Sequence, residues 1–302
     1  MQRREFLGAS MALAASPLLA GPAQSTTAGG WKHGKRWVYS ITFDEGVQKL
    51  LEHTVPICRE HGIPGHVALV SSQIGVKRNV PGSTFHDMMI LNREEIAGLA
   101  KEGWGFSCHS MTHASTTFEN AEVEVVAARK TLEEATGQPI SIFTVPGANA
   151  GHPASLTFAP KGGYDAIMTI YDWVNTKATD LNWLGRCPVH TEYPGPFYSK
   201  FDPYKRLQQA RALGGWVIDY CHCPMPGKPT HPAKDCTTEE LAARFAAVKE
   251  IGGDEVWIAE PNEVVAFLKA DAESQHLRAT PARPEEMVMD EAMRALYRHT
   301  PQ

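Results

Sequence analysis

The sequence lacks basic clusters, long apolar runs and repeats. No run of lysine and arginine is longer than two residues, and the formal net charge is −5. A protein that binds nucleic acid through its phosphates needs a basic stripe, so nucleic acid is excluded as the main partner. No stretch of eighteen apolar residues occurs, and we therefore expect no permanent membrane span.

Cysteines are few. The chain has six, none in a CxxC pair, which is too sparse for a disulfide scaffold. We expect mostly buried free thiols, because cysteine is a small hydrophobe that suits strand interiors. At least one disulfide bridge, or a zinc cluster near His109 or His222, is the alternative. The six are Cys58, Cys108, Cys187, Cys221, Cys223 and Cys236.

What is present is the composition of a globular protein. Of the 302 residues, 43% are hydrophobic and 21% charged, which allows an ample core and excludes disorder as the main state. The length suits one barrel-sized domain or two ordinary domains.

Residues 1–23 have the order of parts of an export signal. Arg3 and Arg4 precede an apolar run, residues 8–20, that is too short to span a bilayer, and small residues follow around Ala23. This order is typical of a twin-arginine signal, with a frayed amphipathic N-terminus as the alternative. We therefore expect a bacterial periplasmic or secreted protein, with residues 24–35 as a linker.

Apolar runs of strand length alternate with amphipathic stretches between residues 36 and 270. Alternating strands and helices predict an α/β fold with a largely parallel sheet, and eight strand candidates favour a barrel over two small domains. Asn92 and Thr237, each followed three residues later by Glu, predict helix N-termini. Residues 271–302 form a C-terminal extension with an expected helix. The strand candidates are 36–43, 66–70, 105–109, 141–145, 164–170, 183–189, 216–222 and 255–259.

Chemically active side chains stand where these strands end. The first strand ends in Asp44 and Glu45, the third in His109 followed by His113, and the seventh in His222. Active sites of parallel α/β folds collect at the C-terminal ends of strands, so these groups should meet. Histidines four apart share one face if the chain turns helical there. One or two carboxylates with two histidines suit a hydrolytic metal ion that keeps an open coordination position.

These motifs resemble those of polysaccharide deacetylases of carbohydrate esterase family four, over residues 36–270. Residues 42–46 resemble the family's TFDDG, residues 109–113 its HSxxH, and His222 its late histidine. Pro146-Gly147 falls where its RxPxG motif lies, and Asp172-Trp173 resembles its DW segment. The resemblance implies a distorted seven-stranded (β/α) barrel and metal-dependent removal of acetyl groups from sugars.

The resemblance also implies roles for single residues. Asp44 would be the general base, and His222 would protonate the leaving group, with Asp172 tuning that histidine. The metal would be a dication such as zinc or cobalt. Its ligands would be Glu45, His109 and His113.

Substrate contacts are expected at two places. The first is the end of the fourth and fifth strand segments, at Pro146, Gly147 and Trp173. The second is the aromatic loop around Tyr193, whose rings could stack on sugars or simply build ordered turns. Residues 71–91 are a possible rim element, His152 could face the substrate, and His66 is expected to be a satisfied histidine of the barrel wall.

Two positions depart from the family pattern. Glu45 stands in place of an Asp and is one methylene longer. Thr144 stands in place of the arginine that braces the base, so we expect the pKa of Asp44 to be raised, because a nearby cation favours the ionised form.

Three functions follow as hypotheses. The favoured one is a metal-dependent deacetylase acting on a polysaccharide or amino-sugar glycan, because Asp44, His109, His113 and His222 occur together. The others are an amidohydrolase of the same barrel family that opens cyclic amides, and a non-catalytic carbohydrate-binding relative.

Overall fold

The computed structural model describes residues 30–147, 149–192 and 204–271. The predicted export signal, most of the predicted linker, Tyr193 with its loop, and the C-terminal residues beyond Asp271 lie outside the described residues.

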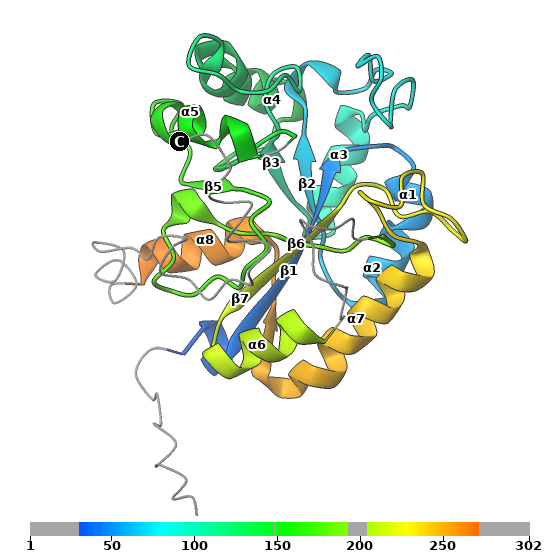
Figure 1. Cartoon of the computed structure of the whole chain (residues 1–302), viewed down its shortest axis with the longest axis vertical. Coiled ribbons are helices and arrows are strands. Elements are labelled where there is room, and N and C mark those ends of the chain that lie inside the picture. Colours follow the sequence, from blue (N-terminus) through cyan, green and yellow to red (C-terminus); the bar gives the residue numbers. More distant parts are fainter. Residues whose placement is uncertain (1–29, 148, 193–203, 272–302) are drawn as a thin grey trace, which may run out of the picture.

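One parallel sheet forms the centre of the molecule (Figure 1). Its strands follow the order β5-β4-β3-β2-β1-β7-β6, and β8 pairs with the first residues of β1. This curled path of seven strands confirms the expected distorted (β/α) barrel. The strands are β1 (Trp37–Glu45), β2 (His66–Leu69), β3 (Gly105–Cys108), β4 (Ile142–Thr144), β5 (Ala166–Met168), β6 (Cys187–Pro188), β7 (Trp216–Cys221) and β8 (Val256–Ile258).

The segment before β6 links the two edges of the curled sheet. Leu184 bridges Met168 of β5, and three residues later Cys187 pairs with Asp219 of β7. The Leu184 N–H donates to the Ile167 carbonyl at 3.1 Å, and the Leu184 carbonyl accepts from the Thr169 N–H at 2.8 Å. Residues between these two contacts are thereby held at the seam, and Arg186 is one of them.

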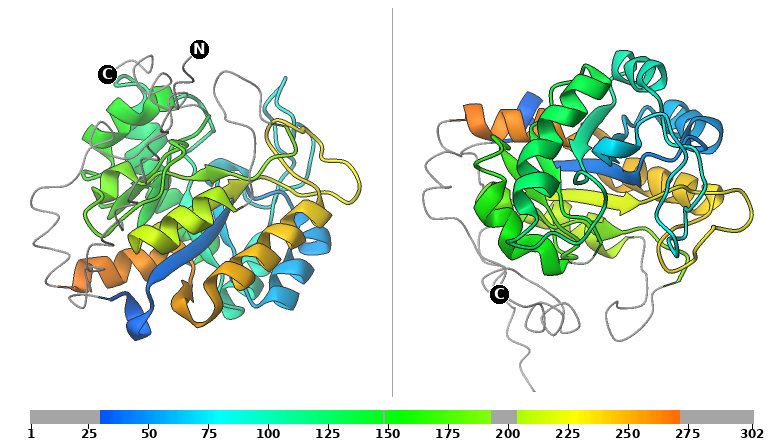
Figure 2. Two further views of the ribbon diagram at one scale, coloured as in Figure 1. Left: turned by 60° about the horizontal axis from the view of Figure 1, so that its bottom comes forward. Right: turned by 90° about the horizontal axis from the view of Figure 1, so that it is seen from above.

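Helices cover the outside of the sheet, and α6 and α7 lie side by side along β1 and β7 (Figure 2). The predicted starts at Asn92 and Thr237 are confirmed, each as a reciprocal capping box with a Glu three residues on. The helices are α1 (Leu50–His53), α2 (Val55–His61), α3 (Arg93–Lys101), α4 (Ala128–Thr136), α5 (His152–Phe158), α6 (Lys205–Leu213), α7 (Thr238–Gly252) and α8 (Pro261–Ala270).

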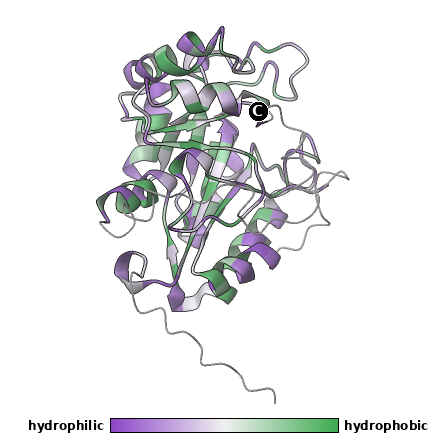
Figure 3. Ribbon diagram, turned by 60° about the vertical axis from the view of Figure 1, so that its left-hand side comes forward, coloured by the Kyte–Doolittle hydropathy of each residue, from purple (hydrophilic) through white to green (hydrophobic). Residues whose placement is uncertain are grey.

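The core lies between the sheet and these helices. Every residue of β1 is buried, as expected of a parallel strand covered on both sides, and this includes polar Ser40 and Thr42 and the two carboxylates at its end. Hydropathy colouring shows mostly apolar strands inside and polar helix surfaces outside (Figure 3). No helix in the described part of the chain is long and apolar enough to cross a membrane.

The cysteines and His66 belong to this interior. All six cysteines are buried and free, as expected. His66 is fully buried in the wall, where its Nδ1 lies 3.1 Å from Glu260 Oε2.

Candidate active site

The two carboxylates at the end of β1 reach the same region through a sharp backbone turn. Neighbouring strand residues normally point to opposite faces. Glu45, however, has a φ of 77° and Gly46 a φ of 73°, so the chain turns sharply where β1 ends at Glu45. A Cβ at position 46 would lie 2.5 Å from the Leu69 side chain, which explains the glycine. The His109 imidazole lies close enough to interact electrostatically with both carboxylates, which places them around one centre.

Glu45, His109 and His113 form a cluster that could hold a metal ion. One ligand atom from each lies within 4.8 Å of the others, and His113 Nε2 is 3.0 Å from Glu45 Oε1. His109 Nδ1 lies 3.0 Å from the Thr144 carbonyl, so Nδ1–H donates there and leaves Nε2 as the ligand atom. Burial lowers the pKa of His109 to about 4, which keeps the imidazole neutral, as ligation requires.

The turn that carries the two histidines is not helical, so helix periodicity does not explain how they meet. Ser110 and His113 have φ values of 69° and 71°, and the His113 N–H donates to Ser110 Oγ at 2.9 Å. Buried Glu124 accepts from the Thr112 N–H at 2.9 Å and from its hydroxyl at 2.7 Å. Glu124 lies in a π-helix, Glu122–Ala127, a distortion that often accompanies functional sites. The turn therefore brings the imidazoles together through residues of left-handed conformation, and the hydrogen bonds from Thr112 to Glu124 hold the turn in place.

The arginine missing at Thr144 is supplied by Arg186, immediately before β6. Its Nη1 donates to Asp44 Oδ1 at 2.6 Å and its Nη2 to Oδ2 at 3.0 Å, a bidentate pair. Burial raises the pKa of Asp44, but the Arg186 charge and its hydrogen bonds outweigh burial and hold the pKa well below its usual range. The expected rise of this pKa is therefore wrong. The partners are 142 residues apart, and no local motif marks Arg186.

A second arginine pairs with Glu45 from the rim. Residues 71–91 leave β2, fold back through an antiparallel bridge between Lys77 and Met89, and carry Arg78 into ion-pair contact with Glu45 Oε2. Burial raises the pKa of Glu45, but the hydrogen bond and charges from His113, His109 and Arg78 bring it down to about 2. The sequence marked these residues as a possible rim element but not Arg78.

His222 faces this centre from the end of β7. Its Nδ1 lies 2.8 Å from the Lys234 carbonyl, and its charge acts on Asp44. Phe85 of the rim segment stacks on the imidazole, with ring centroids 5.4 Å apart, where residues 71–91 meet the loop after β7 (Figure 2). Asp235 of that loop is fully buried and accepts from the His222 N–H at 3.4 Å. Burial raises the pKa of Asp235 to about 6.

Other expected site residues lie elsewhere. Asp172 makes a bidentate ion pair with Arg206 of α6, both contacts at 2.9 Å, and within the described residues it contacts no atom of His222. Trp173 is fully buried and stacks on Tyr171, with centroids 4.8 Å apart. Its expected substrate contact and the tuning role of Asp172 stay predictions without a supporting contact.

Pro146 and Gly147 do follow β4 at the same end of the sheet, and Gly147 is exposed with a φ of 68°. His152 is buried, with Nε2 2.8 Å from the Asn182 carbonyl, so it does not face a substrate. Its ring packs against Trp183, centroids 4.4 Å apart.

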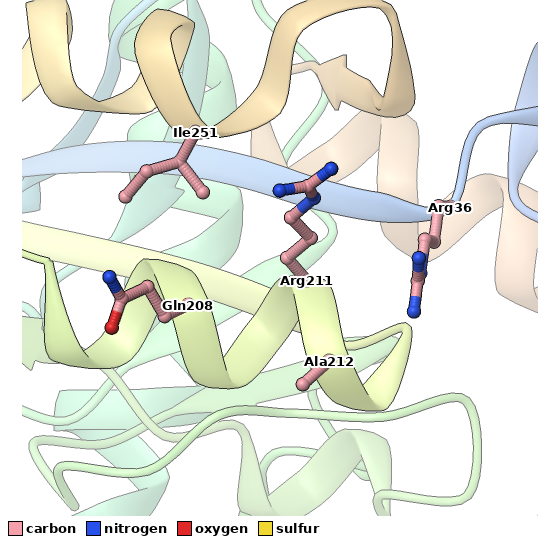
Figure 4. A pocket seen from close by; sticks show the side chains of 5 residues that line it. All are labelled: Arg36, Gln208, Arg211, Ala212 and Ile251. Atoms are coloured by element: carbon pink, nitrogen blue, oxygen red, sulfur yellow. The ribbon is translucent and has the colours of Figure 1, made fainter.

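A hollow of about 360 Å³ lies away from this centre, at the other end of β1 (Figure 4). It is lined by Arg36, Gln208, Arg211, Ala212 and Ile251. Both arginines lie within 4.0 Å of Glu255, which offsets one of their two charges, and the lining holds no nucleophile or metal ligand.

Comparison with known proteins agrees with this geometry. Residues 32–167 match the family model for polysaccharide deacetylases. The matched stretch carries Asp44, Glu45, His109 and His113, and over these residues the chain is similar to the polysaccharide deacetylases. No protein of the curated collections matches it.

Solved structures with a related fold are all distant in sequence. A Mycobacterium smegmatis protein assigned to the polysaccharide deacetylases is 15% identical, with a TM-score of 0.47 over 87% of this chain and 96% of that chain. A family 4 acetyl xylan esterase from Clostridium thermocellum, in complex with a cobalt ion, is 14% identical, with a TM-score of 0.44 over 80% and 96%. A mutant of a family-four pseudoenzyme with restored activity is 17% identical, with a TM-score of 0.45 over 76% and 68%.

Proposed function

We propose that the protein is a metal-dependent hydrolase that removes acetyl groups from a polysaccharide or amino-sugar glycan. One observation carries the proposal. Asp44, which accepts two hydrogen bonds from the Arg186 guanidinium, lies beside the cluster of Glu45, His109 and His113. A base that is ionised at neutral pH next to a cation site is the arrangement that hydrolysis of an acetyl group needs.

The cluster suits a divalent cation. Two imidazole nitrogens and one carboxylate oxygen are a common hydrolytic ligand set, and a 3.0 Å separation between His113 Nε2 and Glu45 Oε1 allows both atoms to bind one ion. When bound, the cation would polarise the acetyl carbonyl and favour ionisation of water. Zinc and cobalt both fit this ligand set.

The chain's own residues divide the proton transfers. Asp44 accepts a proton on a carboxylate lone pair that its contacts with Arg186 leave open. His222 donates Nδ1–H to the Lys234 carbonyl, so its Nε2 is the atom that delivers a proton to the leaving amine or alcohol. Phe85 holds that imidazole in one plane, and its position on the rim suits contact with a sugar ring.

The non-catalytic alternative rested on two departures, and Arg186 accounts for the one at Thr144. The amidohydrolase alternative rested on the same missing arginine. An argument for each of these two hypotheses is therefore removed, and the deacetylase is the function that we test.

The test is acetate release from a panel of acetylated glycans. We expect release that stops on chelation and returns with Zn²⁺ or Co²⁺. Asp44→Asn should lower turnover by about 10²–10⁴ while the metal still binds, because one positioned proton acceptor is lost. The matched control is Arg59→Met, which removes the exposed ion pair between Arg59 of α2 and Glu102. Its turnover should equal that of the wild type. Wild-type turnover in Asp44→Asn, or ring opening of cyclic amides without acetate release, would favour the amidohydrolase.

We also propose that residues 1–23 direct the protein to the periplasm or the cell exterior. Cell fractionation of a variant in which Arg3 and Arg4 are both Lys tests this: the precursor should stay in the cytoplasm, and unchanged export would remove the twin-arginine interpretation.

A further inference from the structure

Four buried charged side chains meet at the end of β1. Asp44 pairs with Arg186, and Glu45 pairs with Arg78. All four are at most 4% exposed. The formal charges of the two carboxylates and the two guanidinium groups cancel. These two buried ion pairs are therefore electrically balanced before any cation enters.

Arg78 is fixed in this position by the rim segment. Its Nη1 donates to Gln73 Oε1 at 3.1 Å, its Nε donates to Ser83 Oγ at 3.3 Å, and its backbone N–H donates to the Met88 carbonyl at 2.8 Å. Within the described residues, Glu45 is the only carboxylate in ion-pair contact with it. A buried guanidinium that lost this partner would be strongly destabilising, so Arg78 cannot readily withdraw.

We propose that Arg78 opposes the divalent cation at the Glu45, His109 and His113 cluster and thereby sets how tightly the metal binds. The inference rests on the metal site of the proposed function. A dication added to a balanced, buried set of charges leaves an excess of positive charge in a medium of low dielectric. Without Arg78, the metal-free site would hold an uncompensated Glu45, and the metal-bound site would lose a repulsion. Both changes favour binding.

The experiment measures metal affinity in the purified full-length protein after chelation. Zn²⁺ is titrated in competition with a chromophoric chelator, for the wild type, Arg78→Met, Arg78→Lys and Arg59→Met. We expect Arg78→Met to lower the Zn²⁺ dissociation constant by about 10- to 100-fold. Mutation of a residue that orients a metal ligand usually changes affinity by a factor of this size, but it weakens binding, whereas loss of Arg78 should strengthen it. Arg78→Lys keeps the charge and should stay within a few-fold of the wild type. Arg59→Met should not change.

Thermal unfolding gives a second readout that does not need activity. Metal-free Arg78→Met should unfold at a lower temperature than the wild type, and a fixed Zn²⁺ concentration should raise its midpoint by more, because stabilisation grows with affinity. If Arg78→Met does not fold, Arg78→Gln, which keeps a donor for Gln73, takes its place.

The outcomes separate this inference from the proposed function. Equal or weaker Zn²⁺ binding in Arg78→Met, with binding that still requires His113, overturns the role of Arg78 alone. Binding that survives His113→Ala places the metal elsewhere and overturns the site. If neither the wild type nor Arg78→Met binds Zn²⁺, both the inference and the metal-dependent function fail.

Discussion

The two halves of the active-site rim are built in different ways. On the β1 and β3 side, Asp44 with Glu45 and His109 with His113 come as short motifs, each from a single turn. On the β6 and β7 side, Arg186 reaches Asp44 across 142 residues, and His222 contacts Asp235 13 residues further on. The comparison teaches that ligands of one ion leave a local pattern in the sequence, whereas groups that tune a base or an acid need only meet in space.

This difference decides what could be predicted. The alternation of strands and helices was sufficient for the fold, because the period of the apolar residues reports burial directly. The site residues at the end of β1 and β3 followed from the same reasoning. Arg186 lay inside the predicted strand 183–189, of which the structure forms only Cys187–Pro188, and nothing in its neighbours indicates that its side chain crosses to Asp44. Arg78 and the left-handed turn at Ser110 likewise depend on tertiary contacts.

The largest expected effect comes from a substitution on the β1 and β3 side of the rim. His113→Ala removes a ligand that sits at 3.0 Å from Glu45, so the protein should lose stoichiometric metal and nearly all acetate release. Elemental analysis measures the metal, and circular dichroism checks that the fold is kept. His53→Ala on α1 is the control and should retain both. A full metal complement in His113→Ala would show that the ligand assignment is wrong.

A smaller effect comes from replacing Arg186, on the β6 and β7 side of the rim. Without the bidentate guanidinium, burial dominates and the pKa of Asp44 rises. The acidic limb of kcat/KM should therefore move to higher pH in Arg186→Met, with partial rescue in Arg186→Lys. The pH–rate profile, taken with metal content, checks this. A profile with an unmoved acidic limb would mean that Arg186 only supports the fold.

The same pair has a consequence for stability. The folded-state pKa of Asp44 is lowered, so its stabilising contribution is present above the unfolded value of about 3.9 and is lost as pH falls through the folded value. Arg186→Met should therefore be destabilised at pH 7, by roughly the 3–5 kcal/mol typical of broken buried pairs, and less at low pH.

The smallest expected effect is a change in the pH dependence of stability, and it concerns Asp235, also on the β6 and β7 side. Burial raises its pKa to about 6 in the folded protein. A raised pKa gives stability that is present below the unfolded value and lost as pH rises through about 6. Urea unfolding of the wild type should thus include a loss of stability between about pH 4 and pH 6 that levels off above the folded pKa and is absent from Asp235→Asn. An identical pH dependence in both proteins would contradict the raised pKa.

The backbone on the β1 and β3 side of the rim also has a consequence for how this protein can be improved. Among the described non-glycine residues, Glu45, Ser110 and His113 are three of the five with positive φ. Such conformations cost on the order of 1–3 kcal/mol each and persist where the surroundings enforce them. A redesign guided by stability alone would replace these residues with glycine first and would remove two ligands of the cluster. The most stable sequence for this fold and the sequence that keeps its chemistry are therefore different, and thermostable variants should be sought away from the ends of β1 and β3.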